Sequence, residues 1–559
     1  PPGAGAGKRR PGPRGRGGAR GAAARRLSAA GRDPDGEAAP RGARRATWLA
    51  VAVGAAATAL AYPPFAVPGL GLVMLAPLAY ALDALAPRRA FFASWIYSLT
   101  AATIAVQWVV YALVFEYRVS ALPAGAFAVI VVGGLALVPG ASGAAYARLA
   151  PRLSSARAPI AFAAVWTLGE WLRGACLGVP WLLSAQTLAR VPIAIQTADL
   201  GGSYAVGFPV AALGAGLGIA ARRRSLRPLA LPLALAAAAL AYGAWRLSTL
   251  GPQAPTAHIG VVQASVPQRE RFRPGSAARN TARHIEATRA LVRSQPLDLV
   301  VWSETAVDTD LDQTPALRAS LEDLARETRV PLLTGAPRSE GGRHTNSVVL
   351  IDPDRGLVAS YAKQVLVPWS EYDPKLGAML APLIGPVTEG VPYTPGDQAT
   401  VFRSGPLAFS APVCFEITYP ALVARFRAGG AELLVNLSND AWFGPVGYPQ
   451  MHLAHAIFRA IETRSWVVRG ANTGISAAID PAGRVVAEIP AFQEGTLVAA
   501  VWPAGPLPPY ARAGDGPVLV ALAALLALAL WCPRRPSSDR AANVDAADLP
   551  RAASGGGES

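Results

Sequence analysis

Eight apolar segments constrain the fold of this chain more than any other feature. They lie at roughly residues 47–62, 69–85, 91–115, 121–146, 159–179, 193–220, 229–247 and 516–532. A helix needs about 20 apolar residues to cross the roughly 30 Å hydrocarbon core of a bilayer. The mean hydropathy of +0.30 and the charged fraction of only 16% agree with repeated crossings. The sequence therefore predicts a multi-pass α-helical membrane domain, with seven transmembrane helices in residues 47–250 and an eighth in residues 516–532.

One long region interrupts this pattern. Residues 256–502 are polar, mixed in composition and rich in strand-like runs, such as 297–302 and 347–351. Short apolar runs of this kind are typical of buried strands. We therefore predict that residues 256–502 form a separate soluble domain between the seventh and eighth helices.

The basic residues of the short loops predict the orientation in the membrane. Lys and Arg are enriched in cytoplasmic loops. After the second, fourth, sixth and eighth segments the chain carries Arg88, Arg89, Arg148, Arg152, Arg157, Arg222, Arg223, Arg224, Arg227, Arg534 and Arg535. The opposite loops hold little beyond Arg118 and Arg190. This pattern places both termini in the cytoplasm and the soluble domain outside it.

Both ends of the chain are predicted to be unstructured cytoplasmic tails. Residues 1–46 contain 12 Lys or Arg and 3 Asp or Glu, with few large apolar residues, a composition that favours disorder. Basic tails also bind nucleic acid, but beside a membrane helix we favour a topology anchor that contacts anionic lipid. The polar residues 533–559 form the other tail.

Cys414 ends the apolar run 407–413 of the soluble region. The other two cysteines, Cys176 and Cys532, lie in or beside apolar segments, so we expect no disulfide within the region. A lone cysteine is often a small buried core residue. A thiol at a strand end, with Glu416 two residues on, also fits a nucleophile. Cys414 alone leaves both interpretations open.

Two further polar residues at strand ends favour the nucleophile. Glu304 follows the run 297–302, and Lys363 comes just after the run 347–351. A carboxylate can take the thiol proton, the thiolate can attack a carbonyl, and an ammonium can stabilise the resulting oxyanion. A neighbouring cation is also expected to lower the cysteine pKa. Glu304, Lys363 and Cys414 together predict acyl transfer through a covalent cysteine intermediate.

These residues and their neighbours resemble a known group of enzymes. Trp302-Ser303-Glu304, Lys363 and Cys414-Phe415-Glu416 are similar to the Glu-Lys-Cys triad of the nitrilase, or carbon–nitrogen hydrolase, superfamily. Within it, residues 366–372, 436–444, 451–454 and 469–476 resemble segments of the apolipoprotein N-acyltransferases, the membrane-embedded branch. The resemblance runs from about the first apolar segment to the last.

The resemblance implies both a fold and an activity. Residues 256–502 are expected to form an exported, nitrilase-like α/β domain with a four-layer α-β-β-α sandwich. A phospholipid would donate an acyl chain to Cys414 as a thioester, and the α-amino group of the N-terminal diacylglyceryl-cysteine of an apolipoprotein would accept it. The expected protein is a monomer in the bacterial inner membrane, with its catalytic domain on the periplasmic side. It is expected to contact membrane lipids, no nucleic acid, no cofactor and no metal ion.

The resemblance also implies roles for further residues. Glu371 and Glu416 would support the triad, Glu371 by positioning Lys363 or by assisting proton transfer. Asn439, Trp442, Phe443 and Phe415 are candidates for substrate binding. Phe415 stands where the family usually has tyrosine, and Phe272 where it usually has tryptophan. Both changes keep the ring and lose its polar group, which bears on substrate preference more than on the reaction.

Glu170 and Arg173 lie within the fifth apolar segment. They are three residues apart, so on an α-helix they share a face and can pair. One interpretation is a structural ion pair between helices. The other is that Arg173 helps to hold a phospholipid headgroup, because ionisable residues inside a membrane are often functional. His452 and His455 are also three apart, but no further ligand supports a metal site.

Other classes of function remain as alternatives. A membrane-tethered carbon–nitrogen hydrolase, or amidase, would give the acyl group to water. A transporter with an exported binding domain would not explain Glu304, Lys363 and Cys414 together. A tether needs only one span, whereas eight suit a donor and an acceptor that both arrive laterally through the bilayer. We therefore predict acyl transfer.

Overall fold

The computed structural model describes residues 41–251, 253–271, 273, 275–372 and 392–531. The chain divides into two compact units, Pro1–Leu49 and Ala50–Ser559. Of the first unit, residues 41–49 are described, as the first turns of helix α2 (Arg41–Ala61). The helix therefore begins inside the predicted tail 1–46, because arginine and alanine are good helix formers. Residues 1–40 of that tail and residues 533–559 lie outside the described residues.

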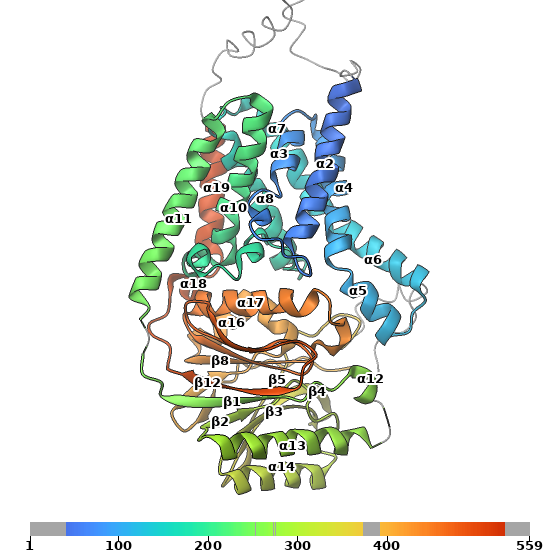
Figure 1. The fold of residues 1–559 in the computed structure, drawn as a ribbon, viewed down its shortest axis with the longest axis vertical. Coiled ribbons are helices and arrows are strands. Elements are labelled where there is room, and N and C mark those ends of the chain that lie inside the picture. Colours follow the sequence, from blue (N-terminus) through green and yellow to red (C-terminus); the bar gives the residue numbers. More distant parts are fainter. Residues whose placement is uncertain (1–40, 252, 272, 274, 373–391, 532–559) are drawn as a thin grey trace, which may run out of the picture. The chain divides into compact units, whose positions relative to one another are not determined.

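All eight apolar segments are helical where the structure describes them (Figure 1). The helices are α2, α3 (Ala76–Leu82), α4 (Pro87–Ala105), α5 (Trp108–Tyr111), α6 (Ala121–Leu135), α7 (Leu137–Leu149), α8 (Ala158–Trp171), α9 (Pro192–Ile195), α10 (Ala198–Arg223), α11 (Ala230–Thr249) and α19 (Gly516–Trp531).

Fewer than eight of these helices are long enough to span a membrane by themselves. In the described chain, three helical stretches are long and apolar enough: Ala121–Arg152, Ala198–Arg223 and Arg227–Thr249. A fourth is reached if the bent pair Pro87–Ala105 and Trp108–Glu116 counts as one span. The count of eight transmembrane helices therefore stays a prediction.

Breaks in the helices account for part of this difference. The pair Pro87–Ala105 and Trp108–Glu116 bends by 52°. π-Helical turns follow α5 and α8, as η2 (Ala112–Glu116) and η4 (Leu172–Cys176). In α10, Gly202 has a φ of +65°, which glycine adopts without a steric penalty. An apolar segment that is broken in this way is long in sequence but forms no single straight helix.

In the described part of the soluble region the strands form two six-stranded sheets, ordered β12-β1-β2-β3-β4-β5 and β11-β10-β9-β8-β7-β6. The strands are β1 (Ala257–Gln263), β2 (Leu299–Val301), β3 (Leu332–Glu340), β4 (Arg343–Asp352), β5 (Gly356–Ala362), β6 (Phe402–Ser404), β7 (Leu407–Ser410), β8 (Leu433–Ser438), β9 (Trp466–Ala471), β10 (Ser476–Ile479), β11 (Val485–Ile489) and β12 (Gly495–Val501). β1, β2 and β3 run parallel, as do β7, β8 and β9, and the outer strands pair antiparallel.

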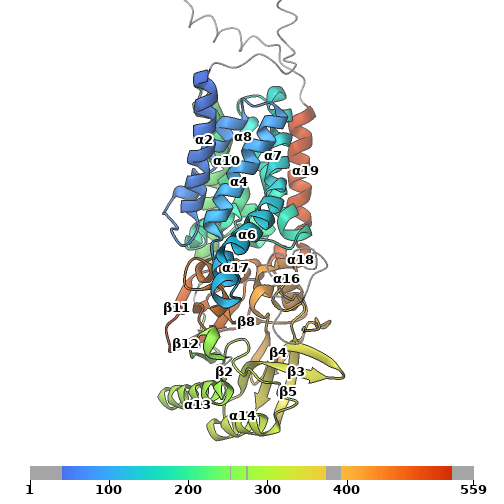
Figure 2. The same cartoon turned by 90° about the vertical axis from the view of Figure 1, so that its right-hand side faces the viewer.

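Helices cover the outer face of each sheet (Figure 1). α13 (Ser276–Ser294) and α14 (Pro315–Thr328) lie on the first sheet, where Leu291 and Leu321 share a buried cluster with Trp302. α16 (Pro420–Ala428) and α17 (Tyr448–Thr463) lie on the second sheet, between it and the helices of the apolar segments (Figure 2). The predicted four-layer α-β-β-α sandwich is therefore confirmed.

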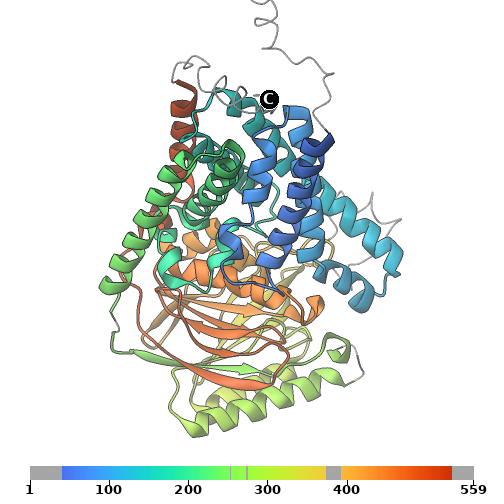
Figure 3. The ribbon, with the colours of Figure 1, turned by 45° about the horizontal axis from the view of Figure 1, so that its top comes forward.

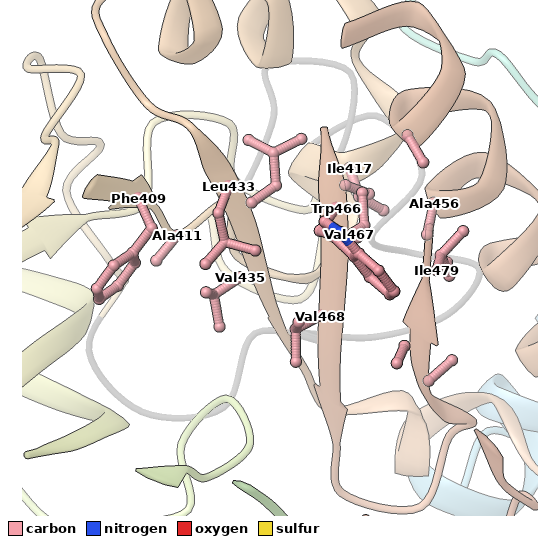
Figure 4. Close-up of a cluster of buried hydrophobic side chains, with 14 of the residues drawn as sticks. Phe409, Ala411, Ile417, Leu433, Val435, Ala456, Trp466, Val467, Val468 and Ile479 are labelled. Atoms are coloured by element: carbon pink, nitrogen blue, oxygen red, sulfur yellow. The ribbon is translucent and has the colours of Figure 1, made fainter. Parts of the chain in front are cut away.

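The second sheet is buried on both faces. β8 and β9 are buried along their whole length, and each begins with a continuous apolar run, 433–435 and 466–468, rather than with alternation. Figure 4 shows Leu433 and Val435 of β8 and Val467 of β9 in the cluster that also holds Ile417 and Ala456. Each such side chain stabilises the fold by roughly 1.5–3 kcal/mol. This core fixes the strand ends from which the candidate site is built.

Buried polar contacts join α17 and its C-terminal end to α10. The backbone N–H and the hydroxyl of Ser203 donate to Glu462 Oε1 over 3.0 and 3.1 Å. Arg464 pairs with Asp199 over 2.6 Å. Buried polar groups are costly when they are left unpaired, so these contacts fix the position of the sandwich relative to α10.

Candidate active site

Glu304, Lys363 and Cys414 lie just beyond three strand ends. Glu304 follows β2, Lys363 directly follows β5, and Cys414 begins the short helix η7 (Cys414–Thr418) beyond β7. All three side chains line one cavity of about 230 Å³. The structure thus brings together the three residues that the sequence singled out, and their catalytic roles remain a prediction.

Lys363 is held by two carboxylates. Its Nζ lies 3.1 Å from Glu304 Oε1 and 2.9 Å from Glu371 Oε2, and its side chain is only 1% exposed. Burial alone would lower the pKa of Lys363, but the Glu304 and Glu371 carboxylates outweigh it and raise the pKa well above its usual value. The ammonium therefore stays charged. It is fixed between Glu304 and Glu371 and can stabilise an oxyanion.

Asn346 of β4 joins the same two carboxylates. Its Nδ2 donates to Glu304 Oε1 over 2.8 Å and to Glu371 Oε1 over 2.7 Å. Its backbone oxygen accepts from the Lys363 N–H over 2.9 Å. Sequence reasoning missed this residue, because one asparagine inside a strand pattern gives no signal of contacts that are distant in sequence.

Backbone donors orient each carboxylate. The Asn439 N–H donates to Glu304 Oε2 over 2.8 Å, and the Val367 N–H donates to Glu371 Oε2 over 2.7 Å. Glu304 Oε1 faces Lys363 and Asn346, so both oxygens of Glu304 have fixed partners. A base that is held in this way loses little entropy when it accepts a proton.

The Cys414 thiol is buried and protonated at rest. The residue is 5% exposed. Burial, together with the Glu304 carboxylate, raises the pKa of Cys414 above its usual value, although Lys363 opposes the shift. Lys363 therefore lowers the pKa of Cys414 as expected, but burial and the nearby negative charge outweigh this one ammonium. The thiol needs a base at the moment of attack.

A buried polar cluster supports the backbone at Cys414. The residue has a φ of +50°, which is uncommon for a side chain other than glycine. His452 Nε2 lies 3.1 Å from the Cys414 carbonyl oxygen, and its Nδ1 lies 3.0 Å from Arg469 Nη2. A carbonyl oxygen only accepts, so Nε2 donates to it. Nδ1 also lies 3.1 Å from Asp440 Oδ1, so Asp440 and Arg469 together hold the ring in place.

Arg469 also pairs with Asp440 over 2.8 Å. Burial alone would raise the pKa of Asp440, but Arg469 outweighs it and holds the pKa well below its usual range. His452 thus serves the nucleophile's backbone and, in the described residues, belongs to no cluster that could hold a metal ion.

Glu416 joins the two loops that carry Lys363 and Cys414. Its Oε1 accepts from the Tyr361 hydroxyl over 2.8 Å, and from the N–H groups of Gln364 and Val365 over 2.6 and 3.0 Å. Its Oε2 accepts from the Val413 N–H over 2.7 Å. One buried carboxylate therefore ties the end of β5 to the residue before the nucleophile.

Three of the predicted substrate-binding residues line the cavity. They are Asn439, Trp442 and Phe443. Trp442 stacks on Tyr117, with ring centroids 5.1 Å apart, and Phe443 stacks on Tyr448 at 4.0 Å. Tyr117 follows η2, so a segment between α5 and α6 contacts the wall of the cavity.

Phe415 is absent from the described lining of this cavity. It packs instead beside Tyr419 and against the buried cluster of the helical region. Its neighbour Cys414 contributes to the cavity, so the two successive side chains meet different surroundings. Phe272 lies outside the described residues.

Arg173 is not among the residues of the catalytic cavity that the structure describes. It lines a small cavity of about 70 Å³ within the helices and donates to the Leu182 carbonyl over 3.2 Å. No ion pair joins it to Glu170 in the described chain, and Glu170 Oε1 accepts instead from Ser184 and Trp166. Glu170 and Arg173 both line this cavity, but each binds other partners, so the ion pair that their spacing allows is not formed.

Sequence reasoning also missed Arg271 and Tyr393. Both line the cavity, and Arg271 donates to the Thr305 carbonyl. In sequence Arg271 stands among other charged residues, which is the usual pattern of a solvated surface. Only the fold brings its guanidinium beside the catalytic carboxylates.

Two family models match this chain. "Carbon-nitrogen hydrolase" matches residues 258–505, and "Apolipoprotein N-acyltransferase N-terminal domain" matches residues 54–217. Among solved structures, an amidase from Nesterenkonia sp. aligns with 49% of this chain and 98% of its own, at 20% identity and a TM-score of 0.36.

Two relatives match this chain over nearly all of their own length. The chain is 33% identical over 523 residues to the apolipoprotein N-acyltransferase of Azotobacter vinelandii, covering 90% of this chain and 98% of that protein. It is 30% identical over 480 residues to the apolipoprotein N-acyltransferase of Geobacter metallireducens, with 83% and 90% covered. The chain therefore belongs to the apolipoprotein N-acyltransferase family of the nitrilase superfamily, and it is an acyltransferase.

Proposed function

We propose that this enzyme transfers an acyl chain from a phospholipid to the α-amino group of the N-terminal diacylglyceryl-cysteine of apolipoproteins. The reaction is ping-pong, and Cys414 carries the acyl chain as a thioester. One observation supports this proposal most strongly: Glu304, Lys363 and Cys414 line a single cavity, with Lys363 fixed 3.1 Å from Glu304.

The first half-reaction forms the thioester. Glu304 takes the thiol proton, and the Cys414 thiolate attacks an ester carbonyl of the phospholipid. The charge that develops on the carbonyl oxygen is stabilised by the Lys363 ammonium. The intermediate then collapses, the C–O bond breaks, and the lysophospholipid oxygen leaves with the proton that Glu304 carried.

The second half-reaction reverses these roles. The lipoprotein amine attacks the thioester carbonyl and again forms an oxyanion beside Lys363. Glu304 accepts the proton that the amine loses, and the C–S bond breaks to give the amide. The proton then returns from Glu304 to the sulfur, so the enzyme ends in its starting state.

Acyl transfer requires that water is kept from the thioester. Aromatic rings of Trp442 and Phe443 line the cavity, and the residues between α5 and α6 pack against this wall through Tyr117. Phe127 of α6 likewise lies edge-to-face with Trp369, at 5.4 Å between centroids. These apolar contacts suit lipid substrates that reach the cavity from the side of the helices.

The proposed setting follows the loop charges. The enzyme lies in the bacterial inner membrane with eight spans, and the catalytic region, which is the sandwich within residues 256–502, faces the periplasm, where lipoprotein N-termini are exposed. Three apolar helices of sufficient length in the described chain support a membrane setting.

Hydrolysis is the second candidate, since a thioester in this fold can also react with water. A direct assay separates the two. The enzyme in detergent is incubated with phospholipid carrying a labelled acyl chain and a synthetic diacylated lipopeptide. We expect the label on the peptide amine. The matched control is the same peptide with an acetylated N-terminus, which should remain unlabelled. Label released as free fatty acid at the same rate with either peptide identifies a hydrolase.

A further inference from the structure

A second cavity, of about 770 Å³, lies where α10 and α11 meet the edge of the second sheet. None of the described residues that line this cavity also lines the catalytic cavity. Figure 3 shows the green helix α11 reaching the catalytic region, where the chain continues into β1. Leu250 on this crossing and residues 502–509 on the return crossing after β12 both line the cavity. Both connections between the helical and catalytic regions therefore border it.

The charged groups of this cavity leave one positive charge uncompensated. Its described lining includes three arginines and two aspartates, namely Arg246, Arg464, Arg484, Asp199 and Asp480. The side chain of Arg246 is 20% exposed and that of Arg484 is 46% exposed. Both guanidinium groups can therefore donate further hydrogen bonds into the cavity.

The two carboxylates offer little to a cationic ligand. Asp199 accepts from Tyr242, Arg246 and Arg464, and its side chain is 2% exposed. Asp480 accepts from the backbone of Ala482 and from Arg484, and its side chain is 11% exposed. An ammonium in the cavity would therefore find both of these carboxylates largely buried and already paired with arginine.

The remaining walls are apolar. Trp245, at the last turns of α11, is 55% exposed, and Leu200 is 41% exposed. The Arg246 guanidinium lies 5.5 Å from the Trp245 ring centroid. α11 belongs to one of the stretches long enough to cross a membrane, and Trp and Arg at the end of such a helix lie at the level of lipid headgroups.

We propose that this cavity binds a glycerophospholipid with a net negative headgroup, such as phosphatidylglycerol, at a site separate from the acyl donor's. Arg246 and Arg484 bind the headgroup phosphate, and Trp245 and Leu200 contact the start of the acyl chains. The uncompensated positive charge favours an anionic headgroup over the zwitterionic headgroup of phosphatidylethanolamine. Because both chain crossings border the cavity, the bound lipid holds the catalytic region on α10 and α11 and stabilises the folded enzyme by mass action.

Native mass spectrometry of the full chain in detergent tests this proposal, with equal amounts of phosphatidylglycerol and phosphatidylethanolamine. We expect the wild type to retain one phosphatidylglycerol preferentially. The double variant Arg246→Gln with Arg484→Gln should bind it roughly ten- to thirty-fold more weakly, because each arginine near the surface attracts the anion. Arg227→Gln, at the opposite end of the same stretch, is the matched control and should bind like the wild type.

The melting temperature is a second measurement. It compares the wild type with a single variant, so it remains informative if the double variant does not fold. Phosphatidylglycerol should raise the melting temperature of the wild type more than that of Arg484→Gln alone, whose side chain is exposed. Trp245→Ala should also weaken retention, while leaving both arginines in place.

Three results would overturn the proposal. One is equal retention of phosphatidylglycerol by the wild type and the arginine variants, and another is equal retention of the two lipids. The third is an equal stabilisation by glycerol phosphate at the same concentration, which would identify a site for free anions rather than for lipid.

Discussion

At the scale of single residues, the catalytic cavity places more negative than positive charge around the nucleophile. Glu304 and Glu371 share the single ammonium of Lys363, and the pKa of Cys414 is raised by burial. A preformed thiolate is therefore disfavoured in the free enzyme. In the proposed mechanism, thiol deprotonation and attack are therefore coupled, with Glu304 as the base and Lys363 as the group that favours the charged intermediate.

Substitutions of the triad test these proposed roles. Glu304→Gln removes the base, and Lys363→Ala removes the cation beside the oxyanion. Each should slow thioester formation, and the loss of one such donor is typically worth about 10²–10³ in rate. Cys414→Ser should be inactive, since a carboxylate cannot readily activate a hydroxyl. Single-turnover acylation with labelled phospholipid measures each rate. A Cys414→Ser enzyme with near wild-type acylation would contradict the mechanism.

Asn346 allows a test of positioning, because it holds Glu304 and Glu371 through hydrogen bonds. Asn346→Ala removes one hydrogen bond from each of Glu304 and Glu371. Hydrogen bonds to charged groups contribute about 1.5–3 kcal/mol, so we expect kcat to fall by about ten- to a hundred-fold with little change in KM. Thr345→Val, one residue earlier on the opposite face of β4, is the control and should leave kcat unchanged. Equal losses in the two variants would show that β4 is merely destabilised.

The sequence revealed Glu304, Lys363 and Cys414 because each follows a strand-like run and matches a family motif. Asn346 and Arg271 carried no comparable signal, since their partners are distant in sequence. Phe415 was misplaced because its motif position says nothing of the direction of its side chain. Glu170 and Arg173 do not pair because each binds a residue of the segment 182–184, and helical spacing gives no signal of such contacts.

At the scale of elements, Glu416 holds the end of β5 against the turn that begins η7. Its four donors are backbone N–H groups and one tyrosine hydroxyl. Glu416→Gln keeps the shape but turns an NH₂ group toward some of these donors. A hydrogen bond to a charged group of this kind contributes about 1.5–3 kcal/mol.

We therefore expect Glu416→Gln to lower both the free energy of unfolding and the rate of acylation. Denaturant unfolding followed by tryptophan fluorescence, together with the acylation assay, measures the two effects. The exposed Glu494→Gln is the control and should match the wild type. An unfolding free energy for Glu416→Gln within about 0.5 kcal/mol of the wild type, the usual range for surface changes, would contradict the role of this carboxylate.

Helix α13 carries a buried histidine that links stability to pH. His284 Nδ1 donates to the Asn280 carbonyl over 2.8 Å, and its ring packs 4.8 Å from Trp302. Burial lowers the pKa of His284 to about 4, against about 6.5 in an unfolded chain. Between these values the unfolded state binds a proton that the native state does not.

The free energy of unfolding should therefore decrease as the pH falls from about 6.5 to about 4. The contribution of His284 reaches about 3 kcal/mol, because one pKa unit corresponds to about 1.36 kcal/mol. Unfolding at pH 7 and at pH 5 measures the slope, and His284→Gln should reduce it. An unchanged slope in this variant would assign the pH dependence to other groups.

The strands and the sandwich were predictable because apolar runs and turn residues recur along residues 256–502. The helices were predictable in position but not in continuity. Gly202 and the π-helical turns η2 and η4 interrupt segments that hydropathy alone treats as uniform. The number of transmembrane spans depends on which helices are continuous, and hydropathy alone does not show where a helix is interrupted.

At the scale of the whole molecule, the loop charges predict that the catalytic region faces the periplasm. Single cysteines on a background without native cysteines test this orientation. Ser320→Cys, on the exposed α14, should react with a membrane-impermeant maleimide in intact spheroplasts. Arg227→Cys, before α11, should react only after the membrane is permeabilised. The reverse pattern would invert the topology.

Contacts between the helical and catalytic regions could not be predicted from the sequence. Ser203 and Glu462 are 259 positions apart, and Tyr117 and Trp442 meet only because the sandwich is folded. Local patterns predict each region by itself. The surfaces that join them depend on side chains whose partners lie in the other region.

The most direct test of the central claim is the intact mass of the enzyme after incubation with phospholipid and no acceptor. We predict a mass increase of one acyl chain, located on the peptide that contains Cys414, removed by hydroxylamine and absent in Cys414→Ala. Addition of a diacylated lipopeptide should discharge it with formation of the N-acylated peptide. If the wild type consumes phospholipid steadily without acceptor and never carries the acyl group on Cys414, the enzyme is a hydrolase and the proposed mechanism is wrong.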